Sequence, residues 1–559
     1  MTEATGAERE VGEIYRPAMT SSDPLPQPRL AAIDVGTNTI RLTVAEVQDD
    51  DTYRILDEER EMVRLGEKLD RTGRLSEAAI SRALAAIGKM KAIADGFKIT
   101  QLRAIATSAV REAANGRSFI REVSRQHKVR IDVISGEEEA QLAFRTASRH
   151  FDFQNRATAV VDIGGGSVEV ILSAGTAIDH VYSLPLGAVR VTERLMQSDP
   201  LRSKHWKQMK EEIDRGIRSI IRQPAHRAEL MIGSGGTFTS LAHMSKWQRE
   251  GRHGSVHGYV LTPSEIIHLL GRLRKTPLEG RLQIPGLSAD RADIIVAGAA
   301  VISRLVRGLD TQQILVNERG IRDGLLLQMI ADLPGRSSAS QLPLPGNRIE
   351  WARHFARKAH TNERHCEQVA TLALQILDGV KNRFDLPGSS RDLLHAAAIL
   401  HNIGYLISHS KHHKHAYHLI MHGDLPGFTP HEVELIANVV RYHRRAFPRK
   451  RHENLAYLPR ADQRLIARLS GILRIADGLD RTHSQSVTGI KMRWLQGRLR
   501  MSLEAKSFPE IESAEAERKA DLFRKAFRTD VEMTWRPMRD RSKTNGAVRT
   551  PRLHVVAAS

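Results

Sequence analysis

Apolar and polar positions follow one another along residues 30–330 in a pattern that predicts alternating strands and helices. Short apolar runs at 30–33 and 40–47 predict strands, and the helical spacing of apolar residues over 76–94 predicts an amphipathic helix. The pattern continues with expected strands at 102–106, 130–134, 157–162, 168–172 and 180–184, and with expected helices at 110–123 and 137–147. We therefore expect an α/β region with a largely parallel sheet.

A short motif occurs twice within this region. Ile33–Thr37 and Val161–Gly165 both consist of an apolar residue, an aspartate, a second apolar residue, a glycine and a small residue. In both places an expected strand precedes the aspartate and a further strand follows the glycine turn. The repetition predicts a duplicated fold whose two halves face each other across a cleft.

The pattern changes after a segment rich in proline, glycine and serine. Apolar residues then recur at helical spacing, and near the C-terminus two alternating runs around Gln496-Gly497 predict a hairpin, followed by a helix at 514–527 and a strand at 531–535. The expected divisions are a disordered segment at 1–28, a first α/β domain at 29–150, a second at 151–332, a linker at 333–347, a mainly helical domain at 348–484, a small α+β unit at 485–540 and a flexible tail at 541–559.

The charge of the chain points to an anionic partner. The 559 residues include 84 Lys and Arg against 65 Asp and Glu, which gives a formal net charge of +19 and an isoelectric point near 10.1. Residues 348–559 hold 37 basic and 22 acidic side chains, so this part carries +15 of the total. A strongly basic half with so few acidic residues predicts that the protein handles a polyanion.

The remaining composition predicts a cytoplasmic protein. Cys366 is the single cysteine, which excludes an internal disulfide and fits a reducing compartment. The first residues do not begin a secretory signal, and no stretch approaches the roughly 18 apolar residues of a membrane span. We therefore expect no membrane partner.

Three glycine-rich turns are candidates for binding phosphate. Glycine lets backbone N–H groups converge on an oxyanion, and a neighbouring Ser, Thr or Asn adds a side-chain donor. Each turn follows an expected strand, where ligands bind in open α/β sheets. A single loop of this kind is as readily a tight turn, but three loops with two matched aspartates favour phosphate. The candidate residues are Gly36, Thr37 and Asn38, Gly164, Gly165, Gly166 and Ser167, and Gly235, Gly236 and Thr237.

Three carboxylates lie beside these turns. Asp34 and Asp162 end strands next to a glycine turn, where a carboxylate can hold Mg²⁺ while the turn binds phosphate, and Glu169 lies on the strand that follows. The run Glu137–Glu139 opens an expected helix. Acidic residues in a first helical turn ordinarily complement the helix dipole, and we expect that explanation to cover at least two of the three glutamates.

An ordered series of segments carries a family resemblance. The segments are Ala32–Asn38, Ala106–Asn115, Ile134–Ala140, Val161–Glu169, Ser183–Gly187, Gly233–Thr237, Val256–Gly258 and Arg319–Gly324. Together they resemble the exopolyphosphatase / guanosine pentaphosphate phosphohydrolase family, which belongs to the actin–Hsp70–sugar-kinase superfamily. The resemblance implies duplicated ribonuclease-H-like (actin-like ATPase) domains with a cleft between them, and a homodimer.

The resemblance also implies an activity and roles for residues. It implies hydrolysis of the terminal phosphoryl group of a phosphate chain, with Glu139 as the general base that activates water and Arg111 as a charged clamp on phosphate. Asp162 and Glu169, with Asp34 nearby, would hold Mg²⁺ or another divalent cation, while the turns grip the terminal phosphates. The alternative for Arg111 is an ordinary surface ion pair. The Gly233–Thr237 loop contacts adenosine in ATP-using relatives and here frames the cleft.

The helical part resembles a second kind of domain. His365, His401-Asn402 and Asp477 resemble the metal-binding residues of the HD phosphohydrolase domain, except that an amide replaces the bridging carboxylate. For that reason we expect no second catalytic metal site here, but a helical scaffold in which Asp477 caps or pairs.

Two basic runs in the helical part are candidates for a polyphosphate channel. A charge run is ordinarily a solvated face, but both runs lie in the most basic part of the chain, and both have counterparts in long family members. The candidate residues are Lys411, His412, Lys414, His415, Arg441, His443, Arg444 and Arg445.

Four functions are compatible with these observations. We favour a Mg²⁺-dependent, processive exopolyphosphatase, and the alternative is removal of the terminal phosphate of guanosine pentaphosphate (pppGpp), which uses the same catalytic residues. A nucleic-acid-binding protein is disfavoured by an aromatic content of 5% and by the lack of a binding motif, so we expect no nucleic-acid partner. A kinase or chaperone of the same superfamily would require ATP turnover.

Overall fold

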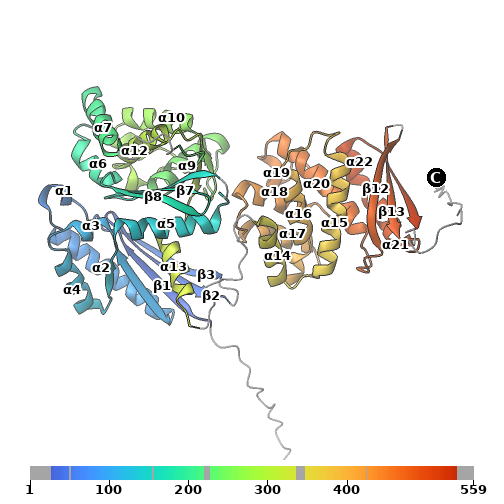
Figure 1. Ribbon diagram of the computed structural model, residues 1–559, viewed down its shortest axis with the longest axis horizontal. Helices are drawn as coiled ribbons and strands as arrows, with labels where there is room; N and C mark the ends of the chain where they lie inside the picture. Colours follow the sequence, from blue (N-terminus) through green and yellow to red (C-terminus); the bar gives the residue numbers. More distant parts are fainter. Residues whose placement is uncertain are drawn as a thin grey trace, which may run out of the picture.

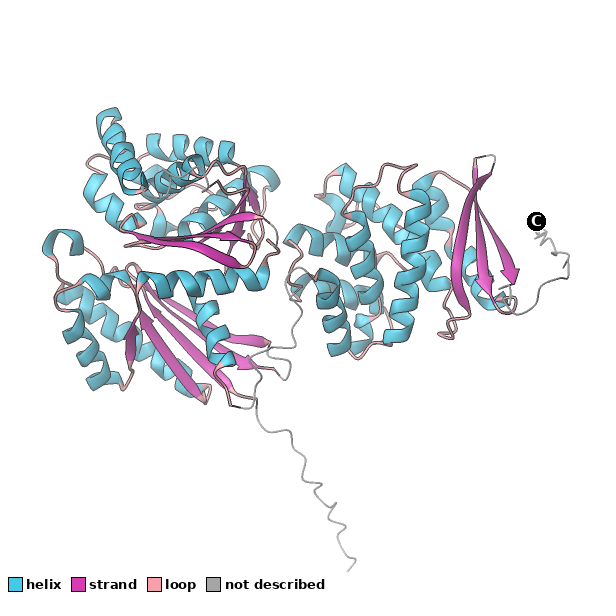
Figure 2. Ribbon diagram, viewed as in Figure 1, coloured by secondary structure: helices cyan, strands magenta, loops and turns pink. Residues whose placement is uncertain are grey.

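The structure of the protein is a computed structural model that describes residues 27–48, 52–153, 156–218, 227–334, 347–423, 425–495 and 497–537. The predictions for the N-terminal segment up to residue 26, for residues 335–346 of the linker and for the tail after 537 therefore lie outside the described residues. Figures 1 and 2 show two α/β lobes next to each other, with a helical region and a small sheet beside them. No helix in the described ranges combines the length and the apolar character needed to cross a membrane.

The first α/β lobe is built on a five-stranded sheet in the order β3-β2-β1-β4-β5. Its strands are β1 (Arg29–Val35), β2 (Thr39–Val47), β3 (Tyr53–Met62), β4 (Gln101–Ala106) and β5 (Ile131–Val133). β1, β2 and β3 form an antiparallel meander, whereas β4 and β5 continue the sheet in parallel. The helices that follow these strands are α1 (Leu69–Thr72), α2 (Glu77–Gly96), α3 (Ser108–Glu112), α4 (Gly116–His127) and α5 (Gly136–His150).

The second lobe repeats this topology. Its sheet has the order β10-β11-β9-β6-β7-β8, in which β6, β7 and β8 form the meander and β9 and β11 the parallel part. The strands are β6 (Ala157–Ile163), β7 (Val168–Ala174), β8 (Ala177–Leu184), β9 (Leu230–Ser234), β10 (Val260–Leu261) and β11 (Gln313–Asn317). The shared order confirms the predicted duplication. The expectation of a largely parallel sheet was wrong, because each meander contributes antiparallel pairs and both sheets are mixed.

The helices of the second lobe cover its sheet around an apolar core. They are α6 (Ala188–Leu195), α7 (Ser203–Gly216), α9 (Gly236–Glu250), α10 (Pro263–Lys275), α11 (Leu278–Arg281) and α12 (Ile295–Gly308), with a 3₁₀ turn at Ala289–Arg291. α12 is buried along most of its length and packs against α6, α9 and α10. The last helix, α13 (Ile321–Ala331), instead returns to the first lobe and packs on β1 and α5.

Helix α5 connects the two lobes. It packs on α13 and also against β6, β7 and β8 of the second sheet, so it lies between the two sheets, as Figure 1 shows. Leu142 and Ala143 belong to the core formed with β1 and α13, whereas Ala140 and Phe144 belong to the core under β6 and β9. A helix that is buried on two sides is held firmly, which matters because its first turn lies at the candidate site.

The C-terminal half is helical with one small sheet. Its helices are α14 (Arg348–Lys358), α15 (Glu363–Val380), α16 (Ser390–Leu400), α17 (His412–His422), α18 (Pro430–Arg441), α19 (Glu453–Ala456), α20 (Arg460–Gly478), α21 (Glu510–Lys519) and α22 (Asp521–Phe527), with a 3₁₀ turn at Ile403–Leu406. The sheet has the order β12-β13-β14, formed by β12 (Val487–Leu495), β13 (Arg498–Ala505) and β14 (Val531–Pro537). Helices and sheet share a single apolar core, in which Gly471 closely approaches the backbone of Phe523.

Candidate active site

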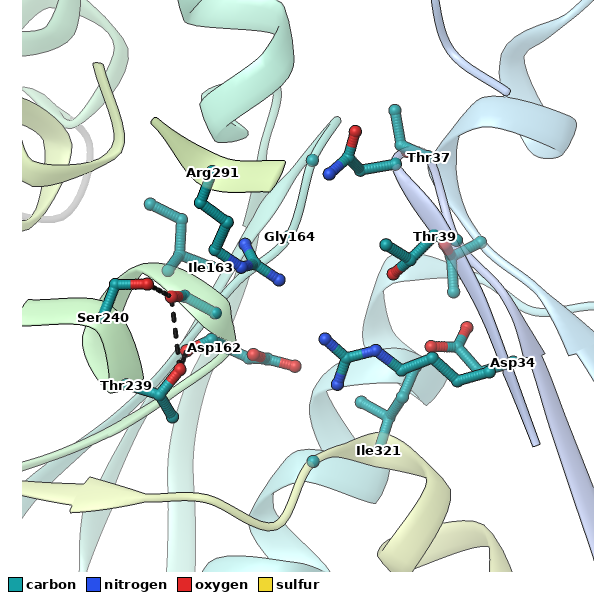
Figure 3. A pocket seen from close by; sticks show the side chains of 18 of the residues that line it. Asp34, Thr37, Thr39, Asp162, Ile163, Gly164, Thr239, Ser240, Arg291 and Ile321 are labelled. Atoms are coloured by element: carbon teal, nitrogen blue, oxygen red, sulfur yellow. Dashed lines mark hydrogen bonds between the residues drawn. The ribbon is translucent and has the colours of Figure 1, made fainter. Parts of the chain in front are cut away.

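One cavity of about 370 Å³ lies between the two lobes and is lined by residues from both. The first lobe contributes the turn after β1, and the second contributes the turns after β6 and β9. Figure 3 shows Asp34, Thr37 and Thr39 facing Asp162, Gly164 and Arg291 across this space. The cleft predicted from the repeated motif is therefore present, and both aspartates of the motif line it.

The two matched glycine turns approach each other closely. A Cβ atom added to Gly165 would lie 2.9 Å from the Cβ of Thr37, and one added to Gly166 would lie 2.3 Å from the Oγ of Ser108. Contacts below 3.0 Å are essentially never seen for real Cβ atoms, so these positions require glycine. The absence of side chains at Gly165 and Gly166 lets the turn after β6 lie against the hydroxyl-bearing residues Thr37 of the first turn and Ser108 of α3, an arrangement that suits phosphate binding.

The third turn precedes helix α9. Gly235 has φ +92°, a conformation that L side chains rarely adopt, and a Cβ there would lie 2.4 Å from the carbonyl oxygen of Ile163. The guanidinium of Arg291 lies directly over Gly236, in the space that a Cβ atom there would fill. The turn therefore presents the N-terminus of the 15-residue helix α9 and the guanidinium of Arg291 to the same cavity, and both features favour binding of an anion.

Four acidic groups lie around the cavity, of which Asp162, Glu139 and Glu169 are buried and Asp34 is half-buried. Burial raises the pKa of Asp34 to about 6 and raises the pKa of Asp162, and nearby negative charge adds to the effect for Asp34. Burial, together with the charge of Asp162, raises the pKa of Glu169 to about 8. Burial and the charges of Glu169 and Asp162 raise the pKa of Glu139 well above its usual value. Without a cation, these carboxylates disfavour one another's ionised form.

Two atoms of this acidic group indicate where a cation fits. Oδ1 of Asp34 and Oε2 of Glu169 are buried and have no hydrogen-bond partner, although Oε1 of Glu169 accepts a 2.9 Å hydrogen bond from the Oγ of Ser183. Asp162 and Glu169 are direct register partners on β6 and β7. A set of carboxylate oxygens with unsatisfied buried atoms suits a hard divalent ion such as Mg²⁺.

The three consecutive glutamates in the first turn of α5 have different surroundings. Glu138 closes a capping box with Ser135, since each side chain bonds the other's backbone N–H, and Glu137 is exposed. Glu139 alone is buried and lines the cavity. The expectation that at least two of the three serve only the helix end agrees with this arrangement.

Arg111 lies behind Glu139, outside the cavity wall. Its Nη1 donates a 2.8 Å hydrogen bond to the carbonyl oxygen of Ile134 and lies 3.4 Å from Oε2 of Glu139. It is absent from the residues that line the cavity. The predicted role of Arg111 as a clamp on phosphate stays a prediction, and in this structure its contacts are with the glutamate and the backbone before α5.

Four arginines on the cavity wall had no role in the sequence prediction. Arg41 lies opposite Asp34 in the β1–β2 register, Arg60 lies on β3, Arg291 ends the 3₁₀ turn and Arg322 opens α13. Burial lowers the pKa of Arg291 to about 9 and that of Arg60 to about 10, with mutual repulsion contributing. Arg60 also pairs with Asp290 and Arg322 with Glu58, and the four guanidinium groups together place positive charge where phosphate oxygens can bind.

The structure differs from the prediction at two further candidates near the cavity. Thr237 is 1% exposed and faces Gly298 of α12, so its side chain cannot reach the cavity, whereas Thr239 and Ser240 of the same helix line it. Glu169 is not among the lining residues, but it is the register partner of Asp162, so its predicted place beside the cation stays a prediction. The predicted residues that do line the cavity are Asp34, Gly36, Thr37, Asn38, Glu139, Asp162, Gly164, Gly165, Gly166, Ser167, Gly235 and Gly236.

A second cavity of about 1040 Å³ adjoins the first, and it lies between the second lobe and the helical region. Glu318, Gly320 and Arg322 line both cavities. Its further wall residues include Lys246, Arg249, Arg252, His257, Tyr259, Arg319, Phe428 and Glu434. The interface here is held by an ion pair between Arg252 and Glu434 at 3.2 Å.

The candidate channel residues lie elsewhere. None of the eight lines either of these cavities. His412 and His443 are buried with their Nε2 atoms 3.3 Å apart, so the prediction that they line a channel was wrong for these two. His412 lies in the first turn of α17 and His443 in the bend after α18, and both face inward, while Lys411, Lys414, Arg444 and Arg445 are exposed. Arg441 lies over the ring of Tyr417, and His415 is half-buried.

The residues of the HD-like skeleton come together. His365, His401 and Asp477 each offer one potential ligand atom, and these atoms lie within 4.8 Å of one another. Asp477 pairs with Lys519 through Nζ–Oδ2 at 2.7 Å, as the pairing role predicted for it requires. Asn402 is buried at the start of the 3₁₀ turn and is not part of this cluster.

Comparison with known proteins gives consistent matches. A model of the Ppx/GppA phosphatase family matches residues 43–333, and a model of Ppx/GppA phosphatase domain III matches residues 348–512. A solved exopolyphosphatase from Cytophaga hutchinsonii is 28% identical, and the alignment covers 55% of this chain and 100% of that one with a TM-score of 0.52. A solved exopolyphosphatase-like protein is 29% identical, with 55% and 98% covered and a TM-score of 0.50.

Proposed function

The chain belongs to the Ppx/GppA phosphatase family, and from that membership we propose that it is an exopolyphosphatase, which removes the terminal phosphate of inorganic polyphosphate. The observation that carries the proposal is the composition of one cavity. Two glycine turns from the duplicated lobes, one buried glutamate and four arginines line the same 370 Å³ space. Glycine turns and arginines bind phosphate oxygens, and the glutamate accepts a proton.

The residues of the cavity have different roles in hydrolysis. The turns at Gly36 and Gly165 hold the terminal phosphoryl group through backbone N–H and hydroxyl donors. Glu139 orients a water molecule in line with the terminal phosphorus and takes its proton as the new P–O bond forms. The bridging P–O bond then breaks, one phosphate leaves, and the shortened chain keeps the bridging oxygen. Arg291 and Arg322 neutralise the charge of the oxygens during this step.

A divalent cation fits the carboxylates beside Glu139. Asp34, Asp162 and Glu169 would hold Mg²⁺, which would supply positive charge to the phosphate oxygens. The same charge would favour the ionised form of Glu139, whose raised pKa otherwise keeps a proton on the group that must accept one. Arg111 contributes to the same end, because its guanidinium lowers the pKa of Glu139.

The adjoining cavity supports a long substrate. A chain whose end lies in the first cavity can extend past Arg322 into the second, whose lining includes Lys246, Arg249 and Arg319 as well as the carboxylates Glu250, Glu318 and Asp323. A substrate held along two cavities stays bound after each cleavage, so hydrolysis would be processive. No Phe, Tyr or Trp is among the residues that line the first cavity, which agrees with a substrate that has no base to stack.

The second candidate activity is removal of the terminal phosphate of guanosine pentaphosphate. Tyr259, which is half-buried, lines the second cavity, where its ring can stack on a purine. Side-by-side measurement of phosphate release separates the two substrates. We expect a kcat/KM for long polyphosphate at least tenfold above that for pppGpp in the presence of Mg²⁺, and the reverse order would make the nucleotide the substrate.

A further inference from the structure

Helix α5 carries the proposed general base at one end and a buried histidine at the other. Glu139 lies in its first turn, and His150 is its last residue, about 16 Å further along the helix axis. The helical period brings Glu139, Thr146 and His150 to the same face of the helix. His150 is 6% exposed, and no step of the proposed hydrolysis uses it. The face of α5 that carries the base therefore also carries a buried polar group whose role is unassigned.

This face of α5 packs against the first turn of α13, which lies beside it in Figure 1. A Cβ atom added to Gly324 would lie 2.2 Å from the carbonyl oxygen of Leu142, so the two backbones are in direct contact. The Oγ1 of Thr146 donates a 3.3 Å hydrogen bond to the carbonyl oxygen of Gly320. Gly320 and Arg322 line the catalytic cavity. The packing of α5 on α13 therefore sets the distance between the base and this phosphate-binding end of α13.

His150 extends this contact to the end of α5. Its Nε2 lies 3.2 Å from Oδ2 of Asp323 on α13, and both side chains are buried. Burial, together with the charge of Arg319, lowers the pKa of His150 well below its usual value, so the ring is neutral and carries one N–H group. Because a carboxylate oxygen can only accept, that hydrogen lies on Nε2 and is donated to Asp323.

Neighbouring side chains hold both partners of this hydrogen bond in place. Nη1 of Arg319 lies 3.4 Å from Oδ1 of Asp323 and 3.3 Å from the Oη of Tyr53 on β3. The ring of His257 packs edge-on against the ring of His150, with 5.3 Å between the centroids. Buried polar networks whose members are satisfied make the surrounding structure rigid. The hydrogen bond between His150 and Asp323 is therefore a fixed connection between the two helices.

We propose that His150 and Asp323 are positioning residues, whose hydrogen bond fixes the carboxylate of Glu139 relative to the phosphate-binding end of α13. The inference rests on the proposed role of Glu139 as the base. Arg111 contacts the beginning of α5, and His150 attaches its end, so the two contacts together fix the direction of the helix. A base must lie within hydrogen-bond reach of the attacking water, and a displacement of about 1 Å caused by a remote change can cost about 10²-fold in rate.

Phosphate release from polyphosphate by full-length variants of His150 tests this inference. His150→Phe fills the space without a donor, and we expect its kcat to fall by about 10- to 100-fold while KM stays within twofold of the wild type. His150→Gln places an amide N–H near the position of Nε2 and should regain most of the loss. Arg145→Ala, which changes an exposed residue of α5, should match the wild type. A wild-type kcat in His150→Phe, or equal losses in the Phe and Gln variants, would overturn the proposal.

Two further measurements separate positioning from folding and from the proposed function. Asp323→Ala removes the acceptor of the same hydrogen bond, so it should reproduce the loss of kcat, and circular dichroism should show each variant folded at the assay temperature. In a Glu139→Gln background, His150→Phe should lower kcat no further, because no base remains to be positioned, and an additional tenfold loss would contradict the inference. Failure of the wild type to release phosphate from polyphosphate or pppGpp would contradict the proposed function itself, whereas unchanged kinetics of His150→Phe would contradict the positioning role alone.

Discussion

The Nη1 atom of Arg111 lies 3.4 Å from Oε2 of Glu139, and the same nitrogen donates a 2.8 Å hydrogen bond to the carbonyl oxygen of Ile134. The guanidinium is therefore hydrogen-bonded to the backbone just before α5, and it contacts the carboxylate of Glu139 from outside the cavity. It also lowers the pKa of that carboxylate, against burial and three negative neighbours that raise it. We therefore propose that Arg111 acts on the reaction through Glu139.

Replacing Arg111 should change the pH dependence of the reaction. In Arg111→Ala the pKa of Glu139 rises further, so less of it is ionised at neutral pH, and each pKa unit lowers the ionised fraction about tenfold. We expect the acid limb of the kcat profile to move to higher pH, with a largely unchanged KM. Arg111→Lys should restore part of the shift, and Arg117→Ala, an exposed arginine of α4, should have no effect. A drop in kcat without any movement of the acid limb would contradict this role.

The stability of the metal-free protein should fall as pH rises. Burial raises the pKa of Asp34 from 3.8 to about 6 and that of Glu169 from 4.5 to about 8, so the folded state holds these protons more tightly than the unfolded state. The stabilisation is present at low pH and is lost as pH rises through the two folded-state values. Mg²⁺ should therefore raise the melting temperature of the N-terminal half more at pH 8 than at pH 5, by roughly a few degrees.

Differential scanning calorimetry with and without Mg²⁺ measures this effect. The double variant Asp34→Asn, Glu169→Gln lacks the two carboxyl groups that titrate. Both the pH dependence of its melting temperature and the increase that Mg²⁺ causes should therefore be smaller than in the wild type. A wild-type melting temperature that responds equally to Mg²⁺ at both pH values would contradict the placement of the cation on these carboxylates.

Arg291 should contribute to binding of the terminal phosphates. Its guanidinium covers Gly236 and faces the cavity, and hydrogen bonds to charged groups are worth about 1.5–3 kcal/mol. We therefore expect Arg291→Ala to lower kcat/KM by roughly 10- to 100-fold. Arg307→Ala, an exposed arginine on α12, serves as the matched control. Similar kinetics for both variants would exclude Arg291 from substrate binding.

Chain-length dependence should separate the second cavity from the exposed basic run. Lys246 and Arg249 line that cavity, whereas Lys414, Arg444 and Arg445 line neither cavity. The double variant Lys246→Ala, Arg249→Ala should lose affinity for long polyphosphate, with a weaker salt dependence, but keep its rate on short chains. The triple variant Lys414→Ala, Arg444→Ala, Arg445→Ala should behave as the wild type on both. If instead the triple variant lost affinity for long polyphosphate and the double variant behaved as the wild type, the channel would lie at the basic run.

The site residues that could be predicted belong to strong local patterns in the sequence. Asp34, Asp162 and the glycine turns follow apolar strands, and a glycine turn after a strand has a defined place in an α/β sheet. The apolar pattern did not predict β3, and Arg60, which lies on that strand, was therefore not predicted as a site residue. β3 is an edge strand with charged residues on both faces, as Arg54, Asp57 and Glu58 illustrate, and it therefore lacks an alternating apolar pattern.

Element boundaries and burial were harder to predict. The expected helix at 110–123 is two helices, α3 and α4, since the chain is extended at Ala113, and the expected helix at 514–527 is likewise divided into α21 and α22. His412 and His443 belong to charged runs, so their composition suggested exposure. Their burial depends on how α17 and α18 pack, which is a tertiary property that a local run does not reveal.

Phosphate release by Glu139→Gln tests the central claim most directly. The amide cannot take a proton from water, so turnover of long polyphosphate in Mg²⁺ should fall by about 10²–10⁴ while substrate binding is retained. Glu137→Gln, which changes an exposed glutamate of the same helical turn, should match the wild type. Near-normal phosphate release by Glu139→Gln would contradict the account, because the cavity would then hydrolyse its substrate without the one buried carboxylate assigned to activate water.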